Sequence, residues 1–156
     1  MAVGARFHLV SGRRRDGVCV PGWSDPDPGA PDGPWFAWRL LGGNNRELGR
    51  SARVLPSTAD CRAAIETVQR RIRDLTPAVL TEPVANRWTW RLDLDGAAVV
   101  VASRPYHRQR EAQYNLGQFL ACAAEAEVGE PGPPGPRTGR PAALRPGSSR
   151  GAGRPR

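Results

Sequence analysis

Several features that would classify this protein at once are missing from its sequence. The three cysteines, Cys19, Cys61 and Cys122, are odd in number and none belongs to a C-x-x-C pair, which argues against a disulfide framework and against a zinc site. No apolar run approaches the roughly 18 residues that a membrane-spanning helix needs, and no signal-peptide core opens the chain. We therefore expect a cytoplasmic protein without a membrane partner.

Apolar residues are also scarce. They make up 39% of the 156 residues, which is below the usual globular share, whereas the 18 glycines and 16 prolines lie mostly outside a central block. Segments with so little apolar content cannot compensate for the entropy lost on ordering. We expect an N-terminal segment and Pro/Gly-rich linker over 1–34, an ordered domain over 35–128 and a disordered Arg/Pro/Gly-rich tail over 129–156. The sequence does not decide whether residues 5–10 join the sheet of that domain.

Lysine is absent, so that all 23 basic residues are arginines and the formal charge is +8. Residues 131–156 hold six arginines and no acid, which leaves only about +2 (8 − 6) for the rest of the chain. The high charge therefore does not require a basic patch on the domain.

What the central block does contain is an internal repeat. Trp38-Arg39-Leu40 recurs 52 residues later as Trp90-Arg91-Leu92, and Ser51 matches Ser103 at the same offset. Each repeat changes from a period of two to a helical period, which is typical of strands followed by a helix. The two repeats are expected to cover 35–76 and 86–127.

The second repeat shows the pattern most clearly. Residues 87–94 alternate strictly between arginine, threonine or aspartate and tryptophan or leucine, and Asp95-Gly96 then forms a strong hairpin signal. We predict an α+β fold of two tandem ββα repeats that form a four-stranded antiparallel sheet, with two helices packed on its tryptophan face. The opposite face would carry Arg39, Arg87 and Arg91.

These motifs resemble the YegP-like family of small tandem-repeat proteins. The first repeat carries the resemblance as Trp38-x-Leu40-x-x-x-Asn44-Asn45-x-x-Leu48-x-x-Ser51 and Cys61-x-x-x-Ile65-x-x-Val68, and the second as Trp90-x-Leu92, Asp95-Gly96, Val100, Ser103, Tyr106 and Leu116-x-x-Phe119. The resemblance covers residues 35–127 and implies a pair of ββα repeats. It implies no activity, since the family is of unknown function.

Little in the sequence points to catalysis. The two histidines, His8 and His107, have no clustered carboxylate or cysteine partners, and no phosphate-binding glycine loop is present. We predict no catalytic residue, no cofactor and no metal, and we interpret the protein as a non-enzymatic binding or assembly module. Its partner is not identified by the sequence, although self-association or another protein would fit.

Nucleic-acid binding is the alternative function. Arg39, Arg87 and Arg91 on an exposed sheet face could contact phosphates, and the six arginines of the tail could bind nucleic acid weakly and without sequence preference. An uncovered apolar patch or open strand edge would favour assembly, whereas arginines gathered on one face would favour nucleic acid.

Overall fold

A computed structural model describes residues 4–14 and 32–130. Residues 131–156 of the expected tail and Cys19 lie outside these residues. The described elements are β1 (Arg6–Arg14), β2 (Gly33–Leu41), β3 (Glu47–Ser51), α1 (Thr58–Arg70), the 3₁₀ helix η1 (Ile72–Asp74), β4 (Thr76–Glu82), β5 (Arg87–Leu94), β6 (Ala97–Val101), α2 (Gln109–Ala123) and β7 (Glu127–Val128).

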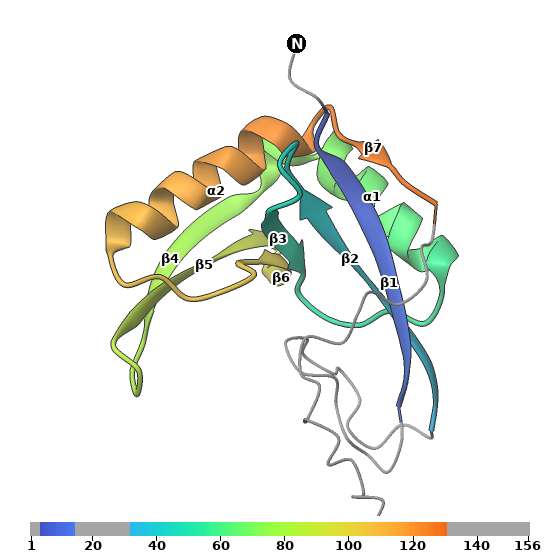
Figure 1. Cartoon of the computed structure of the whole chain (residues 1–156), viewed down its shortest axis with the longest axis horizontal. Coiled ribbons are helices and arrows are strands. Elements are labelled where there is room, and N and C mark those ends of the chain that lie inside the picture. Colours follow the sequence, from blue (N-terminus) through green and yellow to red (C-terminus); the bar gives the residue numbers. More distant parts are fainter. Residues whose placement is uncertain (1–3, 15–31, 131–156) are drawn as a thin grey trace, which may run out of the picture.

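The strands form one mixed seven-stranded sheet in the order β4-β5-β6-β3-β2-β1-β7 (Figure 1). All neighbours are antiparallel except β7, which runs parallel to β1. The predicted four-stranded antiparallel sheet of two ββα repeats is therefore wrong. Three strands, rather than two, precede each helix.

Three strands lie outside the prediction: β1, β4 and the two-residue β7, which pairs with β1. β1 pairs with β2 over nine consecutive residues, which answers the question that the sequence left open about its N-terminal segment. β4 begins at Thr76-Pro77, where a proline after a helical pattern indicates the end of a helix rather than the start of a strand. Because β4 is an edge strand, a proline there need not remove a bond of the ladder. The preceding helix ends at Arg70, and a 3₁₀ turn follows it.

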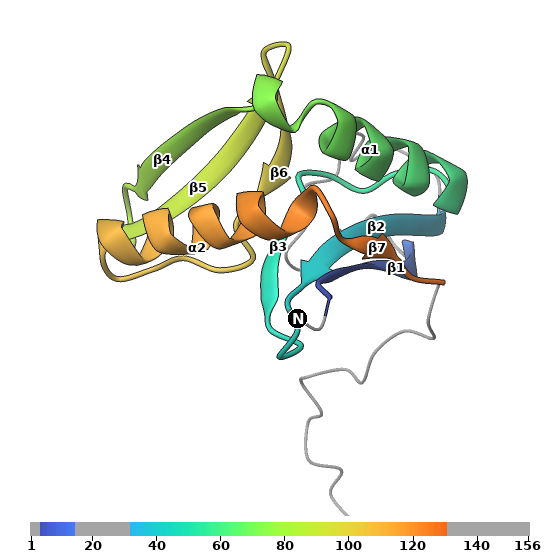
Figure 2. The same cartoon turned by 90° about the horizontal axis from the view of Figure 1, so that it is seen from above.

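Both helices pack against the main hydrophobic core, and a smaller cluster of Trp35, Ala37 and Val54 lies apart from it (Figures 1 and 2). Trp38 and Trp90 are each only 1% exposed. The ring of Trp38 meets Phe7 edge-on at 5.3 Å, and the ring of Trp90 lies 5.5 Å from Phe119 of α2. The helices add their buried stripes to this core: Cys61, Ile65 and Val68 from α1, and Ala112, Leu116, Phe119 and Ala123 from α2.

Local geometry follows the sequence at the turns. Asp95 and Gly96 have φ of 52° and 84°, which are the positive values that a type I′ hairpin turn requires.

Ser51 accepts a hydrogen bond from the backbone N–H of Trp38 at 3.3 Å, and Ser103 donates one to the carbonyl of Glu47 at 3.3 Å. Both repeated serines therefore bond to backbone, as structural residues do.

Candidate functional site

Two of the three predicted nucleic-acid residues lie in one row across the sheet. Pairing of neighbouring strands connects Arg39 of β2 with Arg50 of β3, then with Val101 of β6, and finally with Arg91 of β5. This row lies on the face opposite Trp38 and Trp90, as the alternation predicts.

Acidic neighbours compensate the charges of this row. Glu47 lies 3.8 Å from the Arg39 guanidinium and 2.7 Å from that of Arg50. Arg91 lies 3.1 Å from the carboxylate of Asp93. The arginines on this face of the sheet are therefore already paired with carboxylates.

His8 ends the same row, next to Arg39. The Arg39 guanidinium donates to its Nδ1 at 3.2 Å. Partial burial, together with the positive charges of Arg39 and Arg6, lowers the pKa of His8. A neutral imidazole that accepts a hydrogen bond is what this geometry favours.

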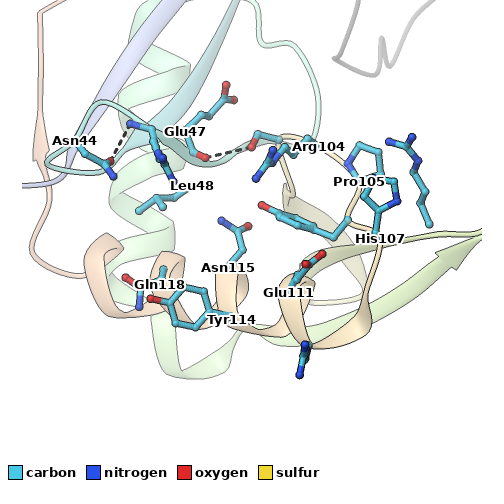
Figure 3. Close-up of a pocket in the computed structure, with 15 residues that line it drawn as sticks. Asn44, Glu47, Leu48, Arg104, Pro105, His107, Glu111, Tyr114, Asn115 and Gln118 are labelled. Atoms are coloured by element: carbon cyan, nitrogen blue, oxygen red, sulfur yellow. Dashed lines mark hydrogen bonds between the residues drawn. The ribbon is translucent and has the colours of Figure 1, made fainter.

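The third predicted residue, Arg87, is separated from the other two. It lies at the start of β5 and lines a groove of about 1390 Å³ beside α2. Three further segments form the groove: the β2–β3 turn with the start of β3, the loop that follows β6, and α2 itself (Figure 3). The full lining comprises Asn44, Arg46, Glu47, Leu48, Arg87, Ser103, Arg104, Pro105, Tyr106, His107, Arg110, Glu111, Tyr114, Asn115 and Gln118.

One stripe of α2 faces this groove. Glu111, Tyr114, Asn115 and Gln118 follow each other at the i, i+3, i+4 and i+7 spacing that places side chains on one side of a helix. The core-facing stripe of the same helix is anchored by Phe119 and its buried neighbours. Because the buried stripe of α2 packs against the core, the stripe on the other side of the helix is held toward the groove.

The groove carries an excess of positive charge. Arg46, Arg87, Arg104 and Arg110 form no ion pair with any residue in the described ranges. The two carboxylates of the lining form their own bonds with other groups, and the lining keeps a net charge of +2 (4 − 2). Glu47 binds the sheet-face arginines, and Glu111 accepts the N–H of Arg108 at 3.3 Å in the capping box of α2.

Aromatic and amide side chains lie between the arginines. The Tyr114 side chain is 72% exposed on α2. Tyr106 is buried and is covered by the Arg104 guanidinium, 5.1 Å from the ring centroid. Asn115 accepts from the indole N–H of Trp90 at 2.7 Å, so that its oxygen is occupied and its NH₂ group is left for another partner.

Other chemistry in the described ranges is limited. Within residues 4–14 and 32–130 no group of three or more histidine, cysteine or acidic side chains could hold a metal ion. Burial, reinforced by the nearby Asp60 carboxylate, raises the pKa of the Cys61 thiol to about 11. No described helix is both long and apolar enough to span a membrane.

Comparison with known proteins gives a fold. No protein-family model matches the sequence, and no curated protein matches it. Two solution NMR structures do match: yegP from E. coli, a protein of unknown function, and a UPF0339 protein from Shewanella oneidensis. The match to yegP has a TM-score of 0.55 and 13% sequence identity, and it covers 82% of this chain and 93% of yegP. The match to the Shewanella protein has a TM-score of 0.55 and 11% sequence identity, and it covers 80% of this chain and 89% of that protein.

This chain has the YegP fold. The family resemblance seen in the sequence and the structural likeness point the same way, and the shared fold covers nearly the whole of both neighbours. Sequence analysis nevertheless missed the groove within this fold. Arg46 and Arg87 lie far in the sequence from Arg104 and Arg110, so only the folded packing of turn, strand, loop and helix brings the four together.

Proposed function

We propose that this protein is a small non-enzymatic member of the YegP-like family whose groove beside α2 binds a polyanion. One observation carries the proposal. Four arginines from four separate parts of the chain line one groove, and none has an ion-pair partner within the described residues. Guanidinium groups bind phosphate and carboxylate groups with paired hydrogen bonds, so an anionic ligand would satisfy them.

Binding fits the groove better than catalysis. A nucleophile needs a base within hydrogen-bond reach, and Ser103 instead donates to the backbone carbonyl of Glu47. Glu111 is held in the capping box of its helix. The polar groups with fixed partners in the groove thus support the loop and helix that shape it.

Nucleic-acid contact through Arg39 and Arg91 on the sheet face stays a second prediction with weaker support. A phosphate would have to displace Glu47 or Asp93 from these arginines. The arginines of the groove require no such exchange.

The proposal is tested by calorimetric titration of the full chain with inorganic polyphosphate at low salt. Arg104→Gln combined with Arg110→Gln should weaken binding at least tenfold, because a hydrogen bond to a charged group contributes about 1.5–3 kcal/mol. The matched control replaces Arg70 and Arg73, which are exposed and lie outside the groove, and removes the same charge. It should bind almost as the original protein does.

Both double variants keep residues 131–156, so any contribution of the tail arginines is the same in each. Circular dichroism confirms that each variant is folded. Equal loss of affinity in the two variants would contradict the proposal, because binding would then depend on net charge rather than on the groove.

A further inference from the structure

We infer that the polyanion is a single-stranded nucleic acid, one base of which stacks on Tyr114. This inference rests on the proposed function and goes further by naming the ligand. Arginines alone would serve any polyanion, but the groove also presents an aromatic ring and three amide side chains. A bare phosphate chain has no base that could stack on the aromatic ring.

Tyr114 is the first of these groups. Its side chain is 72% exposed on the groove stripe of α2, whereas the other groove tyrosine is only 8% exposed and is already covered by Arg104. An exposed ring between arginines is the arrangement by which single strands are held, since bases stack on the ring while phosphates meet the guanidinium groups. In a duplex the base faces are already stacked on each other, so the ring would find no partner.

The amides indicate how a base would be recognised. The side-chain oxygen of Asn44 accepts the backbone N–H of Arg46 at 3.1 Å, and that of Asn115 accepts the indole N–H of Trp90 at 2.7 Å. Each asparagine therefore keeps its NH₂ group for a partner in the groove, where it can donate to a carbonyl oxygen or a ring nitrogen of a base.

The experiment measures fluorescence anisotropy of a labelled oligothymidylate of about 12 nucleotides, within the roughly 4–16 that small single-strand-binding domains cover. An abasic oligonucleotide of equal length supplies the same phosphates without bases. The full chain is compared with Tyr114→Ala, with Tyr114→Phe and with the Arg104→Gln/Arg110→Gln variant. Because Tyr114 is largely exposed, its truncation leaves the core untouched.

Tyr114→Ala should weaken binding of the oligothymidylate at least about fivefold, the lower end of what one stacked base contributes. Tyr114→Phe should restore it, and neither change should affect the abasic strand.

Two results would overturn the inference. If the abasic strand or a duplex of the same length binds as tightly as the oligothymidylate, and only the double arginine variant weakens both, the groove binds polyanions without stacking. The proposed function then stands while the inference fails. If the double arginine variant changes no affinity at all, the proposed function fails with it.

Discussion

The two buried tryptophans at equivalent positions allow a test in which one serves as the control for the other. Trp38 and Trp90 are equally buried and each packs against an aromatic ring. They differ in one respect. The indole N–H of Trp90 donates to Asn115 at 2.7 Å, whereas that of Trp38 is buried and has no hydrogen-bond partner among the described residues.

Replacing each by phenylalanine should therefore have unequal effects. Both changes leave a similar cavity, so the cavity terms nearly cancel. Trp90→Phe also loses a hydrogen bond with a net contribution of about 0.5–1.5 kcal/mol, while Trp38→Phe removes an unsatisfied donor whose burial costs about 1–3 kcal/mol. We expect Trp90→Phe to be less stable than Trp38→Phe by about 1.5 kcal/mol or more.

Urea unfolding followed by far-ultraviolet circular dichroism measures this difference, since that signal does not depend on the tryptophans that are removed. Asn115→Ala gives an independent check, because Trp90→Phe should cost less in that background. A Trp38→Phe variant that is no more stable than Trp90→Phe would refute the reasoning. Truncation of Trp90 to alanine should cost about 3–5 kcal/mol, as for a large aromatic in a core.

Three further predictions follow from particular contacts. A Cβ on Gly49 would lie 2.8 Å from two core rings, so Gly49→Ala should lower the free energy of unfolding by about 1–3 kcal/mol. Gly117 has open space around it in the middle of α2, so Gly117→Ala should raise the free energy of unfolding by up to about 1 kcal/mol. Thermal unfolding of the two variants measures both effects. At pH 8 the Cys61 thiol, with its pKa near 11, should react with iodoacetamide only when the chain unfolds, as peptide mass spectrometry would reveal. The hydrogen bonds that Arg71 donates lower the pKa of Asp95. Their contribution to stability is therefore present above the ordinary aspartate pKa and disappears as the pH falls through the lowered pKa. Urea midpoints of the original chain and of Asp95→Asn should differ near neutral pH and converge in acid.

The sequence predicted the parts of the fold that depend on local patterns. Alternation at residues 87–94 gives β5, Asp95-Gly96 gives a type I′ turn, and the stripe from Cys61 gives the buried face of α1. Three strands, β1, β4 and β7, lie outside the predicted sheet, and β4 illustrates how weak a strand signal can be. In β4 only Val79 and Leu80 are large and apolar, and Pro77 resembles a terminator. At the edge of a sheet neither feature prevents strand pairing, so the tertiary contacts of this segment decide that it forms a strand.

The candidate site was less predictable than the fold. Arg87 was singled out from its place on a strand, and the structure does place it in the groove, but Arg39 and Arg91 lie elsewhere with acidic neighbours. Whether these three contact nucleic acid stays a prediction. Pairing of an arginine with a carboxylate across strands depends on register, and β2–β3 and β5–β6 each contain an irregularity that alternation cannot show.

The internal repeat supplies a comparison that bears on the groove. Aligning the helices by their buried residues matches Ile65 of α1 with Leu116 of α2, and this places Ala63 and Ala64 opposite Tyr114 and Asn115. The core positions of the two helices are alike in kind, since both must fill the same face of one sheet. The two compared positions are not alike: α1 has the exposed Ala63 and the partly buried Ala64 where α2 has an aromatic ring and an amide. Asn115 has a use within the fold, because it accepts the buried indole N–H of Trp90. Packing does not require the exposed tyrosine, and a ligand in the groove gives Tyr114 a use that the fold alone does not.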